Sequence, residues 1–240
     1  MKACKAHLVR WYRFLLILPV FLLAAVPAFS QRGNFGIDVG QVSDKFGALA
    51  PVTAPDFGLN GQITIIQANK DGRPNIVAGG ELRLASDTSA HATEFAVFGG
   101  PSFPIHNFSV GLNAQVRKIL LPTAFVDNTS FQRFDMELLE VPVVLKYKFG
   151  HERRAFIQAQ GGPEFTPRLR MRNPPPIPVD KPNFDYGYTV RGSVGYTFGK
   201  WYAKGTYETR YFKFVQNNNN PQSLYNWRSN LITGGVGLIF

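Results

Sequence analysis

Cysteine is nearly absent from the chain, which has 240 residues and a single thiol at Cys4. Cys4 lies in a segment that we expect to be removed, so the mature protein cannot form a disulfide. The cysteine is also not placed beside a cleavage site, where a lipoprotein carries its acceptor cysteine. Non-covalent interactions must therefore hold the mature fold together.

Long hydrophobic runs are lacking as well. The longest, residues 14–26, spans 13 residues, whereas a membrane-spanning helix needs about 20. Four basic residues precede this run, and small residues around Ala28 follow it. This order is typical of a secretory signal peptide. We expect residues 1–30 to be removed and Gln31 to begin the mature chain.

Acidic residues are fewer than basic ones, 16 against 26, which gives a formal charge of +10. Four of the basic residues belong to the signal peptide, so residues 31–240 hold 22 basic and 16 acidic residues and carry +6. This small excess does not favour a nucleic-acid partner. No linker or charge run divides residues 31–240, and about 210 residues fit one domain.

What the mature sequence does contain is alternation of apolar and polar residues, as in strands with one apolar face. Phe108, Val110 and Leu112 share one face of such a segment, and Ser109 and Asn113 share the other. The predicted strands are residues 33–42, 57–68, 75–86, 92–103, 107–118, 136–149, 153–168, 184–198, 201–214 and 230–240.

These segments predict an all-β fold, a closed antiparallel up-and-down transmembrane β-barrel of ten strands. The polar faces carry too much charge for the interior of a soluble sandwich, so the apolar faces are expected to meet lipid. Outer-membrane barrels have short periplasmic turns and longer outer loops, and the predicted gaps alternate in that way. The predicted long gaps are residues 43–56, 119–135, 169–183 and 215–229. An even strand count places both termini on the periplasmic side.

The opposite face of each strand then points into the barrel. The predicted inward acids are Asp38, Glu81, Glu94, Glu140, Glu164, Asp185 and Glu208. The predicted inward bases are Arg83, Arg117, Lys146, Lys148, Arg191, Lys204 and Arg210. The interior of a small barrel is little wider than its side chains, and unpaired charges there are costly. We interpret these residues as an ionic network that fills the lumen, and a narrow path for ions or solutes is the alternative.

The C-terminal strand has Val236, Leu238 and Phe240 on one face and Gly235 and Gly237 on the other. It resembles the closing strand of bacterial outer-membrane β-barrels, in which the terminal Phe belongs to the signal read by the insertion machinery. That resemblance implies an interaction with this machinery during assembly. We expect the strand to pair with the first one, and the two glycines to leave room for long side chains in the lumen.

A second resemblance lies in the middle of the chain. Leu139–Phe149 and Phe156–Phe165 resemble the paired strands of the small outer-membrane β-barrel domain family, the porin-like and opacity-protein-like group. The resemblance implies the bacterial outer membrane, and because members commonly have eight strands, it makes eight the alternative to ten. The family includes adhesins, assembly factors and structural barrels, so it does not define an activity. Pro142, inside the first segment, predicts a bulge or bend in the wall.

Aromatic residues gather towards the last two predicted strands. We expect them to form belts at the membrane interfaces. The residues concerned are Trp201, Tyr202, Tyr207, Tyr211, Phe212, Tyr225 and Trp227.

The outer loops are where we expect a partner to bind, because lipid covers the wall and side chains fill the lumen. Arg168, Arg170 and Arg172 precede a proline-rich stretch at residues 174–178. This cluster suits a contact with lipopolysaccharide phosphate or with a partner in the envelope or on a host surface. Neutralisation of anionic lipid headgroups explains the same residues equally well. A structural or surface-interaction role of a monomer is the expected function, and a small porin, channel or transporter is the alternative.

Enzyme chemistry has little support in the sequence. His106 and His151 fall in predicted periplasmic turns, and only His91, near Ser86, lies towards the outside. No histidine, acid and nucleophile converge from different predicted strands, so we expect no catalysis. An outer-leaflet lipid-modifying or proteolytic enzyme built on His91 is the remaining alternative. With few histidines and no cysteine, no metal or other cofactor is expected.

Overall fold

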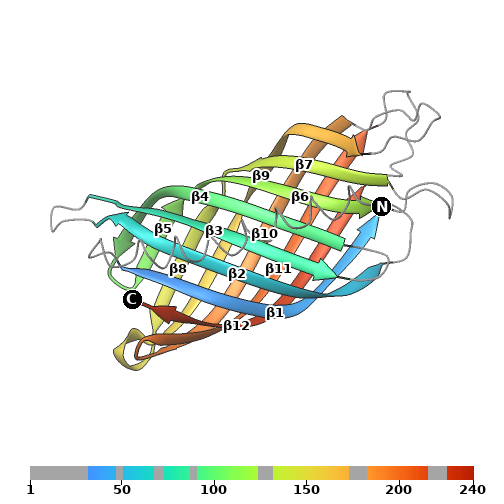
Figure 1. Ribbon diagram of the computed structural model, residues 1–240. Helices are drawn as coiled ribbons and strands as arrows, with labels where there is room; N and C mark the ends of the chain where they lie inside the picture. Colours follow the sequence, from blue (N-terminus) through green and yellow to red (C-terminus); the bar gives the residue numbers. More distant parts are fainter. Residues whose placement is uncertain are drawn as a thin grey trace, which may run out of the picture. The chain divides into compact units, whose positions relative to one another are not determined.

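The computed structural model describes residues 32–46, 51–67, 73–86, 91–123, 132–172, 183–215 and 226–240. The predicted signal peptide and its cleavage point lie outside these residues. The compact unit Gly33–Phe240 is built almost entirely of strands (Figure 1). In the described part of the chain, no helix is long and apolar enough to cross a membrane.

The strand segments follow one another along the chain. They are β1 (Gly33–Phe46), β2 (Val52–Ile66), β3 (Asn75–Ser86), β4 (His91–Ile105), β5 (Phe108–Leu112), β6 (Ala114–Thr123), β7 (Gln132–Glu140), β8 (Val143–Phe149), β9 (Ala155–Arg172), β10 (Asn183–Phe198), β11 (Trp201–Val215) and β12 (Trp227–Ile239). β5 and β6 are halves of one strand interrupted at Asn113, and β7 and β8 are halves of one strand interrupted at Val141 and Pro142. The segments therefore make ten strands.

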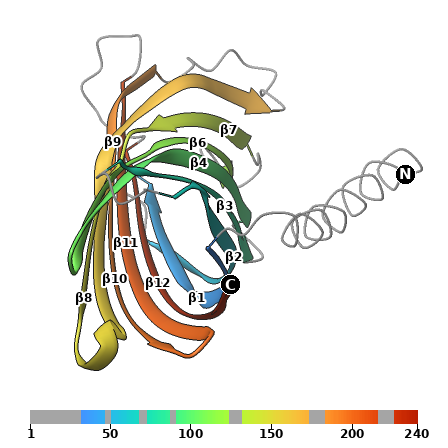
Figure 2. The ribbon, with the colours of Figure 1, turned by 90° about the vertical axis from the view of Figure 1, so that its left-hand side faces the viewer.

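All pairings are antiparallel, and they close a ring. β1 pairs with β2 on one side and with β12 on the other, while β10 pairs with both β9 and β11. Figure 2 looks into this ring. The predicted ten-stranded barrel is confirmed and the eight-stranded alternative is wrong. The expected closure is also confirmed, since Ile37 lies opposite Val236.

Several strands extend further than the sequence predicts. β1 reaches Phe46 and β2 begins at Val52, so the predicted long gap at residues 43–56 is wrong and shortens to residues 47–51. Backbone pairing continues through polar positions, with Ser43 opposite Thr53. The predicted contrast of long and short connections consequently fails at the start of the chain, where residues 67–74 form a longer connection than residues 47–51.

The strand is interrupted at Pro142, but the pairing shows no bulge there, because Glu140 opposite Glu164 and Val143 opposite Gly161 keep one register. Val141 and Pro142 separate β7 from β8, and the neighbouring strand breaks at Asn113. The backbone N–H of Asn113 donates to the carbonyl of Pro142 at 3.0 Å. Because proline has no N–H to give to a continuous ladder, the two breaks lie together at one level of the wall.

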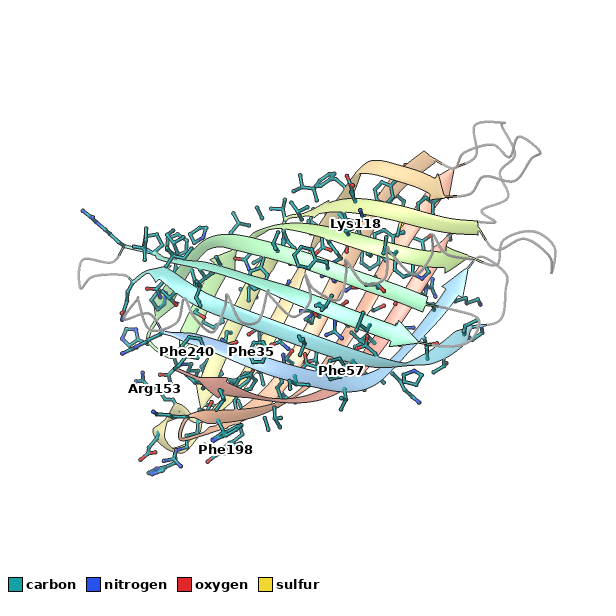
Figure 3. All side chains as sticks on the ribbon, viewed as in Figure 1. Phe35, Phe57, Lys118, Arg153, Phe198 and Phe240 are labelled. Carbon is teal, nitrogen blue, oxygen red and sulfur yellow. The ribbon has the colours of Figure 1, made fainter. Side chains whose placement is uncertain are left out.

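The outer surface is apolar. Along β1, Phe35, Ile37 and Val39 are 38%, 41% and 58% exposed, whereas Asp38 between them is 2% exposed. Figure 3 labels Phe57 and Phe198 among the outward side chains of other strands. The hydrocarbon core of a bilayer requires apolar side chains on the protein surface and hydrogen-bond partners for every backbone N–H and C=O group. An apolar exterior around a closed ring of strands meets both requirements. The fold is therefore that of a transmembrane β-barrel.

The structure places only some of the aromatics predicted for the belts on the outer surface. Trp201 and Tyr207 face outward and are both 50% exposed. Tyr202, Phe212 and Trp227 were wrongly assigned to the surface, because all three are buried inside the barrel. Tyr202 and Phe212 share the strand face of the inward charged residues of β11, so the period of two directs them inward. Tyr225 lies outside the described residues.

Candidate functional site

Side chains inside the barrel form three zones between its two ends. An ionic layer occupies the middle, an apolar layer lies towards the end with the outer loops, and a polar vestibule opens at the end with the short turns. The short-turn end carries His106–Asn107, Gly150–Arg154 and Gly199–Lys200. In outer-membrane barrels such turns face the periplasm.

Two buried arginines anchor one side of the ionic layer. Arg83 donates from Nε to Glu81 at 2.5 Å and from Nη1 to Asp56 at 2.6 Å. Arg117 donates from Nε to Glu140 at 2.6 Å and from Nη1 to Glu94 at 2.8 Å. Arg83 joins its own strand β3 to β2, and Arg117 of β6 joins the two neighbouring strands β4 and β7, so each guanidinium fork ties adjacent parts of the wall together.

Two further arginines cross the lumen. Arg191 of β10 donates from Nη2 to Glu81 of β3 at 2.9 Å, and Arg210 of β11 donates from Nη1 to Glu94 of β4 at 2.6 Å. Both arginines also pair with Glu208. β3 and β10 lie halfway round the ring from each other, as do β4 and β11. Side chains from opposite walls therefore meet in the middle of the barrel.

Asp38 extends the ionic layer towards the vestibule. It accepts a hydrogen bond from Asn60 Nδ2 at 2.6 Å, and Lys204 Nζ lies 3.3 Å from the same carboxylate oxygen. Arg83 Nη2 is 3.8 Å away from it. The negative charge of Asp38, buried in the wall, thus has two cations and an amide beside it.

The structure brings together most of the predicted lumen residues. Those that form the ionic layer are Asp38, Glu81, Arg83, Glu94, Arg117, Glu140, Arg191, Lys204, Glu208 and Arg210, with Glu164 beside them.

Three predicted members are not part of it. Lys146 and Lys148 form no ion pair with a described residue, because they project from β8 closer to the short-turn end than the carboxylates. Lys146 lies 4.5 Å from the ring centroid of Phe156 instead. Asp185 is on the exterior, 2.9 Å from Lys213, because a register shift between Phe184 and Tyr186 turns it out of the lumen.

Glu164 is the least compensated acid of the interior. It is 2% exposed and accepts a hydrogen bond from the hydroxyl of Thr189. It forms no ion pair with a described residue, and its Oε2 has no hydrogen-bond partner. Glu140 lies directly opposite it between β7 and β9. Two carboxyl groups thus face each other in the wall, and only Glu140 has an arginine.

Sequence reasoning missed two buried acids. Asp56, which pairs with Arg83, fell in the predicted loop 43–56, and Asp44 fell in the same loop and accepts from Trp227 Nε1 at 3.2 Å. The signal was present, because Ala54, Asp56 and Gly58 continue the inward parity of β2. Extending the alternation upstream of Phe57 finds Asp56.

The apolar layer was also not predicted. Its centre is a stacked pair, Phe212 and Trp227, whose ring centroids are 4.9 Å apart at 7°. These rings are 0% and 1% exposed. The residues packed around them are Val42, Ala54, Ala85, Ile119, Met136, Leu138, Phe214 and Leu231. Side chains therefore fill the lumen at two levels, charged side chains in the middle and apolar ones towards the outer loops.

The short-turn end has its own ion pair outside the membrane-spanning strands. In the 3-10 turn η2 (His151–Arg153), Glu152 accepts a hydrogen bond from Arg154. This hydrogen bond raises the pKa of the Arg154 guanidinium. Arg154 therefore remains a cation at the entrance of the vestibule.

The remaining predicted sites lie at the two ends of the wall. Val236, Leu238 and Phe240 point outward and are 54%, 41% and 42% exposed. The three predicted contact residues Arg168, Arg170 and Arg172 lie in β9 and not in a loop, since β9 runs to Arg172. Their side chains, and that of His91 at the start of β4, lie outside the described residues.

Comparisons with known proteins find only structural similarities, with low sequence identity and low TM-scores. No protein-family model matches the chain, and no curated protein matches it in sequence. Among solved structures, the outer membrane protease OmpT of Escherichia coli is similar at a TM-score of 0.46 and 11% identity, with 88% of this chain and 96% of OmpT covered. Neisserial surface protein A is similar at 0.41 and 12%, with 87% and 97% covered. Ail of Yersinia pestis is similar at 0.37 and 10%, with 88% and 100% covered. TM-scores below 0.5 carry no argument about activity.

Proposed function

We propose that this outer-membrane barrel is closed to solutes and acts at its outer end, as a structural or surface-interaction protein. One observation carries the proposal. Arg191–Glu81 and Arg210–Glu94 join opposite walls at 2.9 and 2.6 Å, which supports a lumen closed at the ionic layer.

Opening the ionic layer is energetically unfavourable. A passing ion must separate buried arginines from their carboxylates, and breaking one buried pair costs about 3–5 kcal/mol. The apolar layer beyond it, centred on Phe212 and Trp227, offers few groups to solvate an ion, with Asp44 beside Trp227 as an exception. Both barriers support a barrel that does not conduct.

A closed lumen and a lipid-covered wall leave the two ends for specific contacts. Arg168, Arg170 and Arg172 end β9 on the side of the outer loops. Guanidinium groups bind phosphate well, so lipopolysaccharide is the first partner of this end, and an envelope or host-surface partner is the second. The strand face of Val236, Leu238 and Phe240 serves the insertion machinery during assembly. The barrel acts as a monomer and without a cofactor.

The surface role is tested by changing these arginines. We expect Arg168→Gln, Arg170→Gln and Arg172→Gln together to weaken binding of purified lipopolysaccharide to the folded barrel by about tenfold or more, because charge-assisted hydrogen bonds are lost. Lys200→Gln, in an exposed turn at the opposite end, is the control. Equal binding by the triple variant and the wild type would remove lipopolysaccharide as the partner.

A small channel or transporter is the second candidate, because the vestibule gives solutes access as far as the ionic layer. Swelling of vesicles that contain the folded protein, in an isotonic neutral sugar, separates the two. If the barrel is closed, these vesicles should swell at the same rate as vesicles without protein. Faster swelling favours the channel.

The proposal includes no enzymatic activity. His106 and His151 lie at the short-turn end, away from the outer leaflet. If an outer-leaflet hydrolase or protease activity is detected, His91→Ala must abolish it for the enzyme alternative to stand.

A further inference from the structure

The vestibule has the size and access of a ligand site. It encloses about 450 Å³ and opens between the short turns, where Figure 3 labels Arg153. Binding pockets for small molecules commonly measure about 300–1,000 Å³. The inner limit is the ionic layer, since Glu81, Arg83 and Arg191 line the vestibule from that side. A molecule that enters from the periplasm therefore reaches a closed end.

The charges around the vestibule are mainly positive. The basic residues that line it are Arg83, Lys146, Lys148, Arg153, Arg154, Arg191 and Lys204, and the acidic ones are Glu81 and Glu152. The acids of the interior lie deeper, in the ionic layer. Charge is thus separated along the barrel, with the excess of cations at the periplasmic end.

Carboxylates already engage four of these cations. Arg83 and Arg191 pair with acids of the ionic layer, Lys204 pairs with Asp38, and Arg154 pairs with Glu152.

Three cations have no such partner among the described residues: Lys146, Lys148 and Arg153. Lys146 and Lys148 are two positions apart on β8 and share its inward face. Lys146 is partly buried, whereas Lys148 and Arg153 are exposed. The ammonium group of Lys146 is thus partly withdrawn from water without a counter-charge, which is unfavourable, and an anion in the vestibule would supply that counter-charge.

Neutral polar side chains complete the lining. Asn60, Gln158 and Gln160 offer amide groups, and Ser193 and Thr206 offer hydroxyl groups. These groups both donate and accept hydrogen bonds, so they suit the polar remainder of a ligand beside its anionic group. Phe156 adds an aromatic ring on the same wall as Lys146.

From this geometry we propose that the vestibule binds a small soluble molecule carrying phosphate or carboxylate groups, and that Lys146 and Lys148 hold its anionic groups. The molecule enters from the periplasm and leaves by the same way, because the ionic layer closes the far end. This site lies at the opposite end from the proposed surface contacts and does not depend on them.

Isothermal titration of the full-length folded protein in detergent tests the site. The probes are inorganic pyrophosphate and citrate, with glucose as the neutral comparison. We expect pyrophosphate or citrate to bind and glucose not to bind. The variant K146Q/K148Q should weaken anion binding by about tenfold or more, because charge-assisted hydrogen bonds are lost.

The control is Lys200→Gln, which removes a cation from an exposed turn at the same end that does not line the vestibule. It should bind the anions as the wild type does. Heat-modifiable migration in gels verifies that each variant is folded, and K146R/K148R, which keeps both charges, should retain binding if the double glutamine variant does not fold. Absence of binding by both anions overturns the proposal, as does equal binding by K146Q/K148Q and the wild type.

Discussion

The carboxylate of Asp38 occupies the space that a side chain at Gly235 would need. The two residues are opposite each other between β1 and β12, and a Cβ atom at Gly235 would lie 1.9 Å from Asp38 Oδ1. The closing strand β12 thus has a glycine where the ionic layer reaches the pairing of β12 with β1. At Gly237 the space is taken by the ring of Tyr202, at 2.4 Å.

Gly235→Ala is therefore expected to destabilise the barrel, by about 1–3 kcal/mol, the usual cost of overpacking. The measurement is urea-induced unfolding in lipid vesicles. Gly234→Ala is the matched control, because a Cβ atom at this neighbouring position meets nothing within 4 Å. Equal effects of the two substitutions would show that Asp38 does not occupy this position.

Arg117 is expected to be the most sensitive charge of the lumen. Its removal in Arg117→Ala leaves Glu140 and Glu94 without this partner, and loss of one member of a buried pair costs about 3–5 kcal/mol. Lys118→Ala, one residue further along and exposed, should change the free energy of unfolding by about 0.5 kcal/mol or less. Similar losses for both variants would contradict the ionic layer.

Glu164 and Glu140 predict opposite results for the same chemical change. Glu164→Gln removes one of two facing carboxyl groups and keeps an acceptor for the hydrogen bond from Thr189, so stability should stay the same or rise. Glu140→Gln takes the counter-charge from Arg117 and should lower stability, by about 3 kcal/mol. The two unfolding midpoints in urea check the order. A Glu164→Gln variant less stable than Glu140→Gln would refute it.

The apolar layer makes a prediction for tryptophan. Trp227→Ala removes a ring stacked on Phe212 and should cost about 3–5 kcal/mol through the cavity that it leaves. Trp201→Ala, at an exposed outward position, should cost less. In the variant Trp201→Phe without residues 1–30, Trp227 is the remaining tryptophan. Its fluorescence should resist quenching by acrylamide, and ready quenching would place Trp227 outside the lumen.

The period of two predicted the barrel well, because each strand between lipid and lumen alternates strictly. The parity of Asp38, Glu81 and Arg117 could be read from the sequence for this reason. It failed at Asp185, where a register shift reverses the parity, and at Asp56, which lay in a stretch interpreted as a loop.

The pairing of charges could not be read from parity. Which acid meets Arg191 depends on strands that lie halfway round the ring and are distant in sequence. The separate apolar layer escaped prediction because Phe212 and Trp227 were interpreted as surface aromatics. Lys146 and Lys148 point inward as predicted, but they lie in the vestibule and not in the ionic layer. Their position along the barrel axis depends on strand tilt and register, which the sequence pattern does not give.

The closed lumen is tested most directly by the current through the full-length folded protein in a planar lipid bilayer under an applied voltage. The salt bridges across the lumen predict silence from the wild type, with insertion verified separately by heat-modifiable migration of the same sample. A steady current that grows in proportion to voltage would contradict a barrel closed by Arg191–Glu81 and Arg210–Glu94.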